Sequence, residues 1–296
     1  MTLITSSLLG MPHLVNALDE SHCPMKKILC PTDFSETADG AVAYAAKLAQ
    51  KTGSHLALFN VQSFVDKTPE EALLGEQMNA QMAYDRLEEL SREISRVFKI
   101  SCNGNVSTAI AGLSRVIETE ASGHDLIVMG TTGPDDAFQF FFGSNSYRLA
   151  KQTSLPVLVV PAGYGYSNIE QTAFAFDYWR NNTLPMAQLV NVIKPLNSAL
   201  TVLEVLEQSY SPRQEEEILA DQKIIQDVYG KEVSIQFQSL YTRSIPQALD
   251  TYVKENKVDL LALSTQHQSL IDRLFHKSVI KELSRIATYP LLIIHS

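Results

Sequence analysis

A glycine-containing segment, followed nine residues later by a Gly-Ser pair, has the residue types and spacing of a phosphate-binding loop. Gly130 and Gly133 flank two threonines, and Gly143 precedes Ser144. Glycine allows backbone conformations and close approaches that a Cβ atom blocks. Residues 145–153 predict a helix, whose first amides and positive dipole end favour an anion by roughly 0.3–1 kcal/mol per interaction. The segment therefore predicts a site for the phosphates of a nucleotide.

Three predicted strands must position this site. Residues 125–129 form a short apolar run, which is typical of a parallel strand covered on both faces. Two more runs, at 25–31 and 54–61, are also predicted to be strands. Helical spacing is found between the strands, at 36–52, 68–98 and 113–122. Alternating strands and helices imply βαβ units, hence an α/β fold with a parallel sheet. Ligands in such open sheets bind outside the carboxyl ends of the strands, where Asp33, Val61 and Gly130 fall.

The glycine spacing and the order of these strands resemble the ATP-binding signature of the universal stress protein family. Residues 25–36 are similar to the family's first strand, which ends at an aspartate, here Asp33. Residues 54–61 resemble its second strand and 155–161 its last. The resemblance implies open-sheet, parallel α/β domains that are Rossmann-like and similar to adenine nucleotide alpha hydrolases.

The resemblance also implies which residues hold ATP. Those near the adenosine are Pro31, Thr32, Asp33, Val61, Met129 and Gly130, and those near the phosphates are Thr132, Gly133, Gly143, Ser144 and Asn145. Asp135 and Asp136 depart from this pattern, because their charge would repel a triphosphate unless Mg²⁺ lies between them. A simpler interpretation also stands: the glycines only shape turns, and Asp33 belongs to the turn or helix cap before Ser35 and Glu36.

An internal repeat divides the chain into two copies of one domain. Residues 173–177 repeat the strand that ends at Asp33, and 198–205 repeat 54–61, both at an offset of 144. Residues 258–264 repeat 124–130, and 289–294 repeat 155–160, both at an offset of 134. We assign the ten-residue difference to a longer second helix in the first half. The predicted organisation is an extension at 1–24, a first domain at 25–162, a linker at 163–170 and a second domain at 171–296.

The second copy lacks the glycines of the first. Ser264 and His267 stand where Gly130 and Gly133 do, and Lys277-Ser278 where Gly143-Ser144 does. Side chains at those places would crowd a phosphate, so we expect no ATP in this half. Asp177 and Val205 persist at the positions of Asp33 and Val61, which leaves a different ligand open.

Composition narrows the class of partner. The 296 residues, with 45% hydrophobic residues and a net charge of −9, predict a globular protein that avoids nucleic acid and anionic membranes. No apolar run is long enough to span a membrane, and residues 1–24 lack the basic start of a signal peptide. Cys23, Cys30 and Cys102 form no CxxC pair, which favours free thiols and the cytoplasm.

No arrangement of nucleophile, base and orienting group is visible, and the sequence has no GxSxG, HExxH or Walker-type motif. We therefore expect not an enzyme but a stress-response binding module that takes ATP, with Mg²⁺, and an unidentified protein partner. A nucleotide-free interaction scaffold and a slow nucleotide hydrolase are the alternatives. The family resemblance further implies that the halves pair through 157–160 and 291–294 as an internal pseudo-dimer, and a homodimer of chains stays open.

Overall fold

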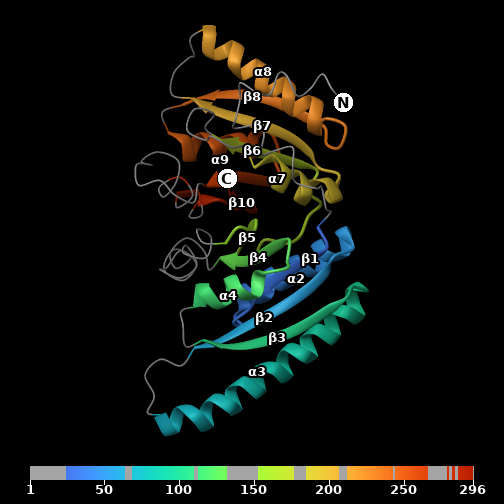
Figure 1. The fold of residues 1–296 in the computed structure, drawn as a ribbon, viewed down its shortest axis with the longest axis vertical. Helices are drawn as coiled ribbons and strands as arrows, with labels where there is room; N and C mark the ends of the chain where they lie inside the picture. Colours follow the sequence, from blue (N-terminus) through green and yellow to red (C-terminus); the bar gives the residue numbers. More distant parts are fainter. Residues whose placement is uncertain are drawn as a thin grey trace, which may run out of the picture. The chain divides into compact units, whose positions relative to one another are not determined.

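The computed structural model describes residues 25–63, 69–109, 113–131, 153–176, 185–206, 212–242, 244–265, 279, 282–283 and 286–295. The chain divides into two compact units. One comprises Met25–Ser167 with Ser284–Leu291, and the other Asn168–Leu283 with Leu292–Ser296. We call them the first and second domains. Each is an α/β unit built on a sheet, as the alternation of strands and helices predicts (Figure 1).

The first domain has a parallel sheet whose strands follow the order β3-β2-β1-β4-β5. The strands are β1 (Lys27–Pro31), β2 (His55–Ser63), β3 (Cys102–Ala109), β4 (Leu126–Thr131) and β5 (Val157–Pro161). The central strands are apolar because both of their faces are covered; Ile28, Leu126 and Ile127 are fully buried. The change of direction at β1 and β4 is the topological switch point of such a sheet.

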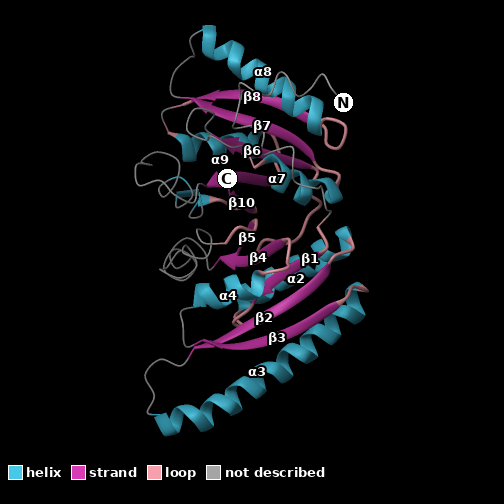
Figure 2. Cartoon of the chain, viewed as in Figure 1, coloured by secondary structure: helices cyan, strands magenta, loops and turns pink. Residues whose placement is uncertain are grey.

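Helices α2 (Glu36–Thr52), α3 (Pro69–Phe98) and α4 (Leu113–Ala121) connect these strands (Figure 2). Helix α2 begins where the Ser35 Oγ accepts a hydrogen bond from the Ala38 amide, and it ends at Gly53 in the left-handed conformation. Its alanine-rich face is buried against the sheet. After β5, Tyr164 and Tyr166 lie near the ring of Tyr44 on α2, with centroids 6.3 Å and 5.0 Å apart.

The second domain repeats this order of strands as β8-β7-β6-β9-β10. Its strands are β6 (Gln171–Phe176), β7 (Ala199–Leu206), β8 (Ile235–Tyr241), β9 (Leu260–Thr265) and β10 (Leu291–His295), and its helices α7 (Met186–Ile193), η3 (Lys194–Leu196), α8 (Pro212–Tyr229) and α9 (Ile245–Glu255). The prediction of two tandem α/β domains is confirmed. Helix α3 has 30 residues against 18 in α8, and the connection from α8 to β8 is two residues longer than that from α3 to β3, which together give the ten-residue change of offset.

One hydrogen-bond arrangement is the same in both halves. The Asp125 Oδ2 accepts hydrogen bonds from the amides of Lys26 and Lys27 at 2.7 and 2.9 Å, just before β1 and at its first residue. The Asp259 Oδ2 accepts them from Glu170 and Gln171, both at 2.9 Å, at the start of β6. The repeat therefore extends from sequence to the bonds that fix the first strand of each sheet.

The sequence predicted neither β3 nor β8. Each is the last strand at one edge of its domain's strand order, and each carries many polar residues. An edge strand has one open side, so it lacks the continuous apolar run that marks the central strands. None of the helices in the described parts of the chain is long and apolar enough to cross a membrane.

Candidate functional site

The predicted adenosine-site residues lie on three neighbouring strands. Strand β1 lies between β2 and β4, so the carboxyl ends that carry Pro31, Val61 and Gly130 belong to adjacent strands. Pro31 pairs with Phe59, and β2 continues beyond that residue to Ser63. Val61 is thus on a part of β2 that extends past the end of β1. The sheet leaves room there for the residues that follow β1.

Hydrogen bonds fix the backbone at Thr32, where β1 ends. The Thr32 amide donates to the Phe59 carbonyl at 2.8 Å, and the Thr32 carbonyl accepts a 2.7 Å bond from the Asn60 side-chain amide. Asn60 is only 3% exposed. Asn60 was not among the predicted site residues; the signal was an amide side chain inside an otherwise apolar strand. It holds the chain in place immediately before Asp33.

Asp33 is exposed and sits in a tight turn between β1 and α2. Its Oδ1 accepts a hydrogen bond from the Ser35 amide at 3.0 Å, and the Thr32 hydroxyl accepts one from the Phe34 amide at 3.1 Å. Phe34 has φ 62°, in the left-handed region. Asp33 therefore does serve the turn, as the simpler interpretation held. Its second carboxylate oxygen forms no hydrogen bond with another described residue, so the carboxylate retains an acceptor for a ligand's hydroxyl groups.

Two apolar side chains border this region. Val61 is half-buried near the end of β2, and Met129 is buried on β4, where it pairs with Val159. An aliphatic or thioether side chain suits the flat face of an aromatic ring. Together with Asp33, they can provide an apolar contact for a base and an acceptor for a sugar.

Gly130 has a structural reason to be glycine. A Cβ atom there would lie 2.7 Å from the Thr37 carbonyl oxygen and 3.3 Å from the Ala41 Cβ, both on α2. Helix α2 therefore packs directly on the backbone of β4. The absence of a side chain at Gly130 is needed for this packing whether or not a ligand binds.

The predicted phosphate contacts lie outside the described residues. These are Thr132, Gly133, Gly143, Ser144 and Asn145, together with Asp135, Asp136 and the predicted helix at 145–153. Only the adenosine half of the predicted site has a described geometry. Within the described parts, no three His, Cys, Asp or Glu side chains come together to hold a metal ion.

The corresponding edge of the second domain differs in charge and bulk. Ser264, in place of Gly130, is 7% exposed, and its hydroxyl has no hydrogen-bond partner among the described residues. Glu204, in place of Asn60, is 4% exposed, and Val205 is also buried. Asp177, His267, Lys277 and Ser278 lie outside the described residues. A buried glutamate therefore stands in the second domain where the first domain has the amide that fixes Thr32.

The two described cysteines are free thiols. Burial raises the pKa of the Cys30 thiol far above its ordinary value, and the nearby Cys102 adds to this effect. Burial also raises the pKa of Cys102, to about 12. Because the thiolate is the reactive form, neither residue is suited to act as a nucleophile or metal ligand at neutral pH. Cys23 lies outside the described residues.

Residues 24–161 match the model of the universal stress protein family. The first domain belongs to the universal stress protein family. A universal stress protein from Archaeoglobus fulgidus has a similar structure, with a TM-score of 0.69 at 15% identity over 92% of this chain and 97% of that one. A putative universal stress protein from Pseudomonas aeruginosa is also similar, with a TM-score of 0.55 at 13% identity over 92% of this chain and 93% of that one.

At these identities the likeness is one of fold, and it covers both domains of this chain. The two-domain form is thus found in solved members of the family. A comparison with curated proteins found no match.

Proposed function

We propose that the first domain binds an adenine nucleotide, with ATP as the expected ligand. One observation carries the proposal: Asp33, Val61 and Met129 belong to three adjacent strands of a universal stress domain, at or just beyond the carboxyl ends of these strands. This is the edge where open parallel sheets bind ligands. The glycine spacing that follows β4 supports a phosphate group as part of that ligand.

Each residue has a role in this proposal. Asp33 accepts hydrogen bonds from the sugar hydroxyls, beside Pro31 and Thr32, while Val61 and Met129 contact the base. The phosphates lie at Gly133, Gly143, Ser144 and Asn145, next to Thr132. Mg²⁺ would neutralise the charge between the phosphates and the two aspartates of the intervening loop. The fixed backbone at Thr32 keeps the Asp33 turn in one conformation before the ligand arrives.

We propose a binding module rather than a catalyst. The Thr32 hydroxyl already accepts a hydrogen bond from the backbone, and the buried thiols are held in their neutral forms. Asp33 is a carboxylate of this turn, and the proposal assigns it to the sugar hydroxyls rather than to the activation of water. Binding in a stress-response protein then acts through the partner that recognises the nucleotide-bound form. The scaffold and hydrolase alternatives make different predictions for the same experiment.

The test begins with the chain as purified. Denaturation followed by anion-exchange chromatography identifies and quantifies any bound nucleotide, and Mg-ATP is then titrated into nucleotide-free protein. We expect one adenine nucleotide per chain, lost in Asp33→Ala and retained in Asp177→Ala, the matched change in the second domain. No binding after Mg-ATP addition favours the scaffold. Steady turnover that Asp33→Ala abolishes favours the hydrolase.

A further inference from the structure

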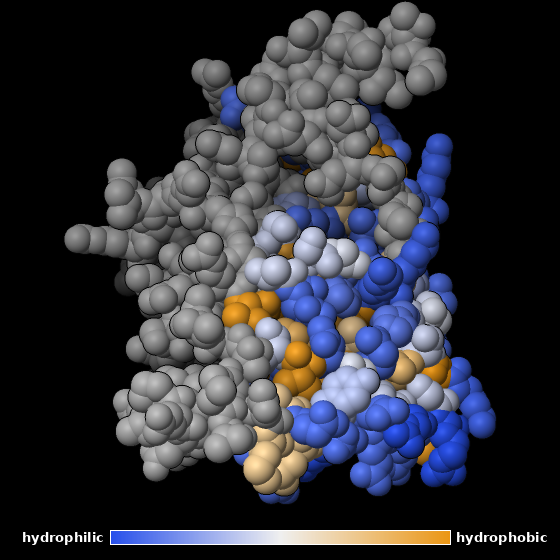
Figure 3. All heavy atoms as spheres, turned by 60° about the horizontal axis from the view of Figure 1, so that its bottom comes forward, coloured by the Kyte–Doolittle hydropathy of each residue, from blue (hydrophilic) through white to orange (hydrophobic). Residues whose placement is uncertain are grey.

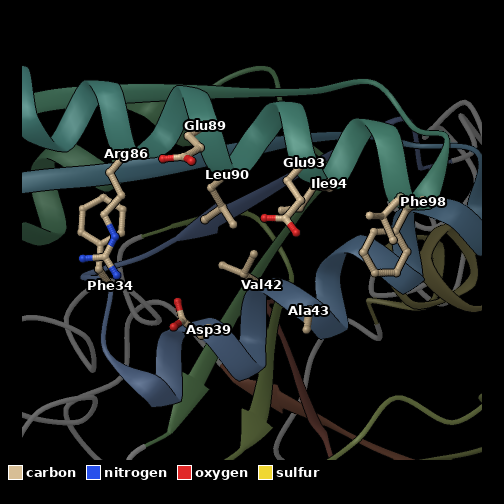
Figure 4. Close-up of a pocket in the computed structure, with 11 residues that line it drawn as sticks. Phe34, Asp39, Val42, Ala43, Arg86, Glu89, Leu90, Glu93, Ile94 and Phe98 are labelled. Atoms are coloured by element: carbon tan, nitrogen blue, oxygen red, sulfur yellow. The ribbon is translucent and has the colours of Figure 1, made fainter.

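A trough of about 420 Å³ lies between α2 and α3 of the first domain, beside the sheet (Figure 4). Its floor is apolar. Val42 of α2 and Ile94 of α3 are 4% and 5% exposed, and Leu90 is half-buried between them. The volume is within the range of small-molecule sites. None of the predicted adenosine contacts lines it.

Both ends of the trough are bounded by specific contacts. At one end the Arg86 guanidinium lies over the ring of Phe34, 4.4 Å from its centroid (Figure 4). At the other end is Phe98, whose carbonyl accepts a 2.8 Å hydrogen bond from the Gln50 side chain. A bounded trough of this volume suits a short molecule rather than an extended peptide. The occupant is therefore expected to be compact.

The charge around the apolar floor is negative. Among the described residues that line the trough are three carboxylates, Asp39 on α2 and Glu89 and Glu93 on α3, and one cation, Arg86. In Figure 4 the Asp39 and Glu93 side chains extend toward the gap between the helices. No ion pair joins any of the three to another described residue. The arrangement thus disfavours phosphates and other anions.

A bare metal ion also fits poorly. No described group of three His, Cys, Asp or Glu side chains is close enough to coordinate one. Carboxylates that do not converge can still attract a cation through longer-range electrostatics, and the buried floor favours an apolar body. These two requirements are met together by an organic cation.

We propose that this trough binds a small organic amine whose ammonium group lies near Glu89, Glu93 and Asp39 and whose apolar tail covers Leu90 and Ile94. The site is separate from the proposed nucleotide site. Phe34 contributes to the trough wall and directly follows Asp33, so the two sites share one turn of the chain.

Surface context supports a local trough rather than a broad docking face. Where Figure 3 shows described residues, the surface is mostly hydrophilic and its apolar side chains form small patches. Met78, Met82 and Val97 of α3 are exposed by 68%, 67% and 51%. Met78 and Met82 precede Arg86 on the helix and do not line the trough.

The test uses 4-phenylbutylamine and its neutral counterpart 4-phenylbutan-1-ol on the full chain. Methyl NMR follows Val42, Leu90 and Ile94, with Ile225 of the second domain as the distant control. We expect the amine to shift the methyl signals of these three trough residues. It should also bind at least about fivefold more tightly than the alcohol, as two or more weak charge contacts imply. Shifts should be absent at Ile225.

Variants distinguish the effect of the carboxylates at this site from the effect of the chain's net charge. The double substitution Glu89→Gln and Glu93→Gln should weaken the amine about tenfold, at about threefold for each carboxylate, and leave the alcohol unchanged. Glu215→Gln with Glu216→Gln on α8 makes the same change in net charge and should have no effect. Equal affinity for amine and alcohol, an unchanged affinity in the first double variant, or no shift at the trough methyl groups would each overturn the proposal.

Discussion

Gly130 on β4 faces the Thr37 carbonyl of α2 so closely that a Cβ atom would lie 2.7 Å from that oxygen. The opposing atom belongs to the backbone of a helix, so it cannot move aside as the end of a flexible side chain can. This relationship assigns Gly130 a packing role that is independent of nucleotide binding. It also determines how variants at this position must be interpreted.

Gly130→Ala is expected to destabilise the first domain by about 1–3 kcal/mol, because α2 must shift away from β4. Urea denaturation of the variant measures the change. Gly40→Ala is the matched control: Gly40 lies within α2, and a Cβ there has no atom within 4 Å. It should stabilise the chain by roughly 0.5–1 kcal/mol through helix propensity. A Gly130→Ala protein as stable as the native chain would contradict the packing argument.

Asn60→Leu should also destabilise the first domain, by roughly 1–3 kcal/mol, because it removes the donor to the Thr32 carbonyl and leaves a buried acceptor unsatisfied. Under the proposed function, the same change should lower the affinity for Mg-ATP, since the Asp33 turn loses its support. Denaturation and nucleotide titration measure the two effects. Gln62→Leu is a graded comparison on the same network: it keeps the bond from Asn60 to the Thr32 carbonyl but removes the side-chain amide that donates to the Asn60 Oδ1, so a smaller loss of stability is expected.

The central elements followed from sequence because burial on both faces leaves a continuous apolar run, as in β4 and β5. Helix α2 was predictable to its ends because Ser35 and Gly53 are recognisable caps. The edge strands β3 and β8 were not predicted, because polar residues interrupt their apolar ones. In the predicted site, Asp33 and Val61 were assigned through the family resemblance, and the structure places both near the carboxyl ends of adjacent strands.

Three-dimensional contacts account for what the sequence could not give. The roles of Asn60, Thr37 and Arg86 depend on contacts between elements that are distant in the chain. No local pattern of residue types records which side chain will meet the Thr32 carbonyl or the Phe34 ring. Spacing and family resemblance therefore predict where a site would lie, while the contacts that support those residues became visible only in the fold.

His124 provides a pH-dependent contribution to stability. Burial lowers the pKa of its imidazole, and the neutral form is favoured in the folded chain. The unfolded chain has the ordinary value of about 6.5. The contribution is thus fully present above about pH 6.5 and is lost as the pH falls from there through the folded pKa, because the unfolded chain then binds the proton more readily.

We therefore expect the native chain to lose stability relative to His124→Gln as the pH is lowered from 7.5 to 5. Urea denaturation across this range gives the difference between the two proteins, in which acid effects from other groups cancel. If the free energies of unfolding of the two proteins change in parallel with pH, the imidazole titrates alike in the folded and unfolded chains and the prediction is wrong.

Cys30 and Cys102 should resist alkylation in the folded protein. Burial raises the pKa of both thiols, to about 12 for Cys102 and higher for Cys30, so the thiolate population is very small at pH 8. Timed iodoacetamide labelling with peptide mass spectrometry measures each site separately. Labelling in urea provides the control, in which both should react readily. Rapid labelling of Cys30 in the native chain would mean that β1 opens to solvent.

Substitutions at Phe34 test whether the backbone or the ring sets the shape of the turn after β1. Its φ of 62° costs a residue with a Cβ roughly 1–2 kcal/mol more than glycine, so Phe34→Gly should be more stable than Phe34→Ala by about 1 kcal/mol. Both variants lose the contact with Arg86, which cancels in the comparison. Lys99, with φ 56° and no comparable ring contact, is the matched position for the same pair of substitutions. The Gly variant could be more stable than the Ala variant at Lys99 but not at Phe34. That result would mean that the turn relaxes once the ring is gone, and that the Phe34–Arg86 contact holds the left-handed conformation beside Asp33.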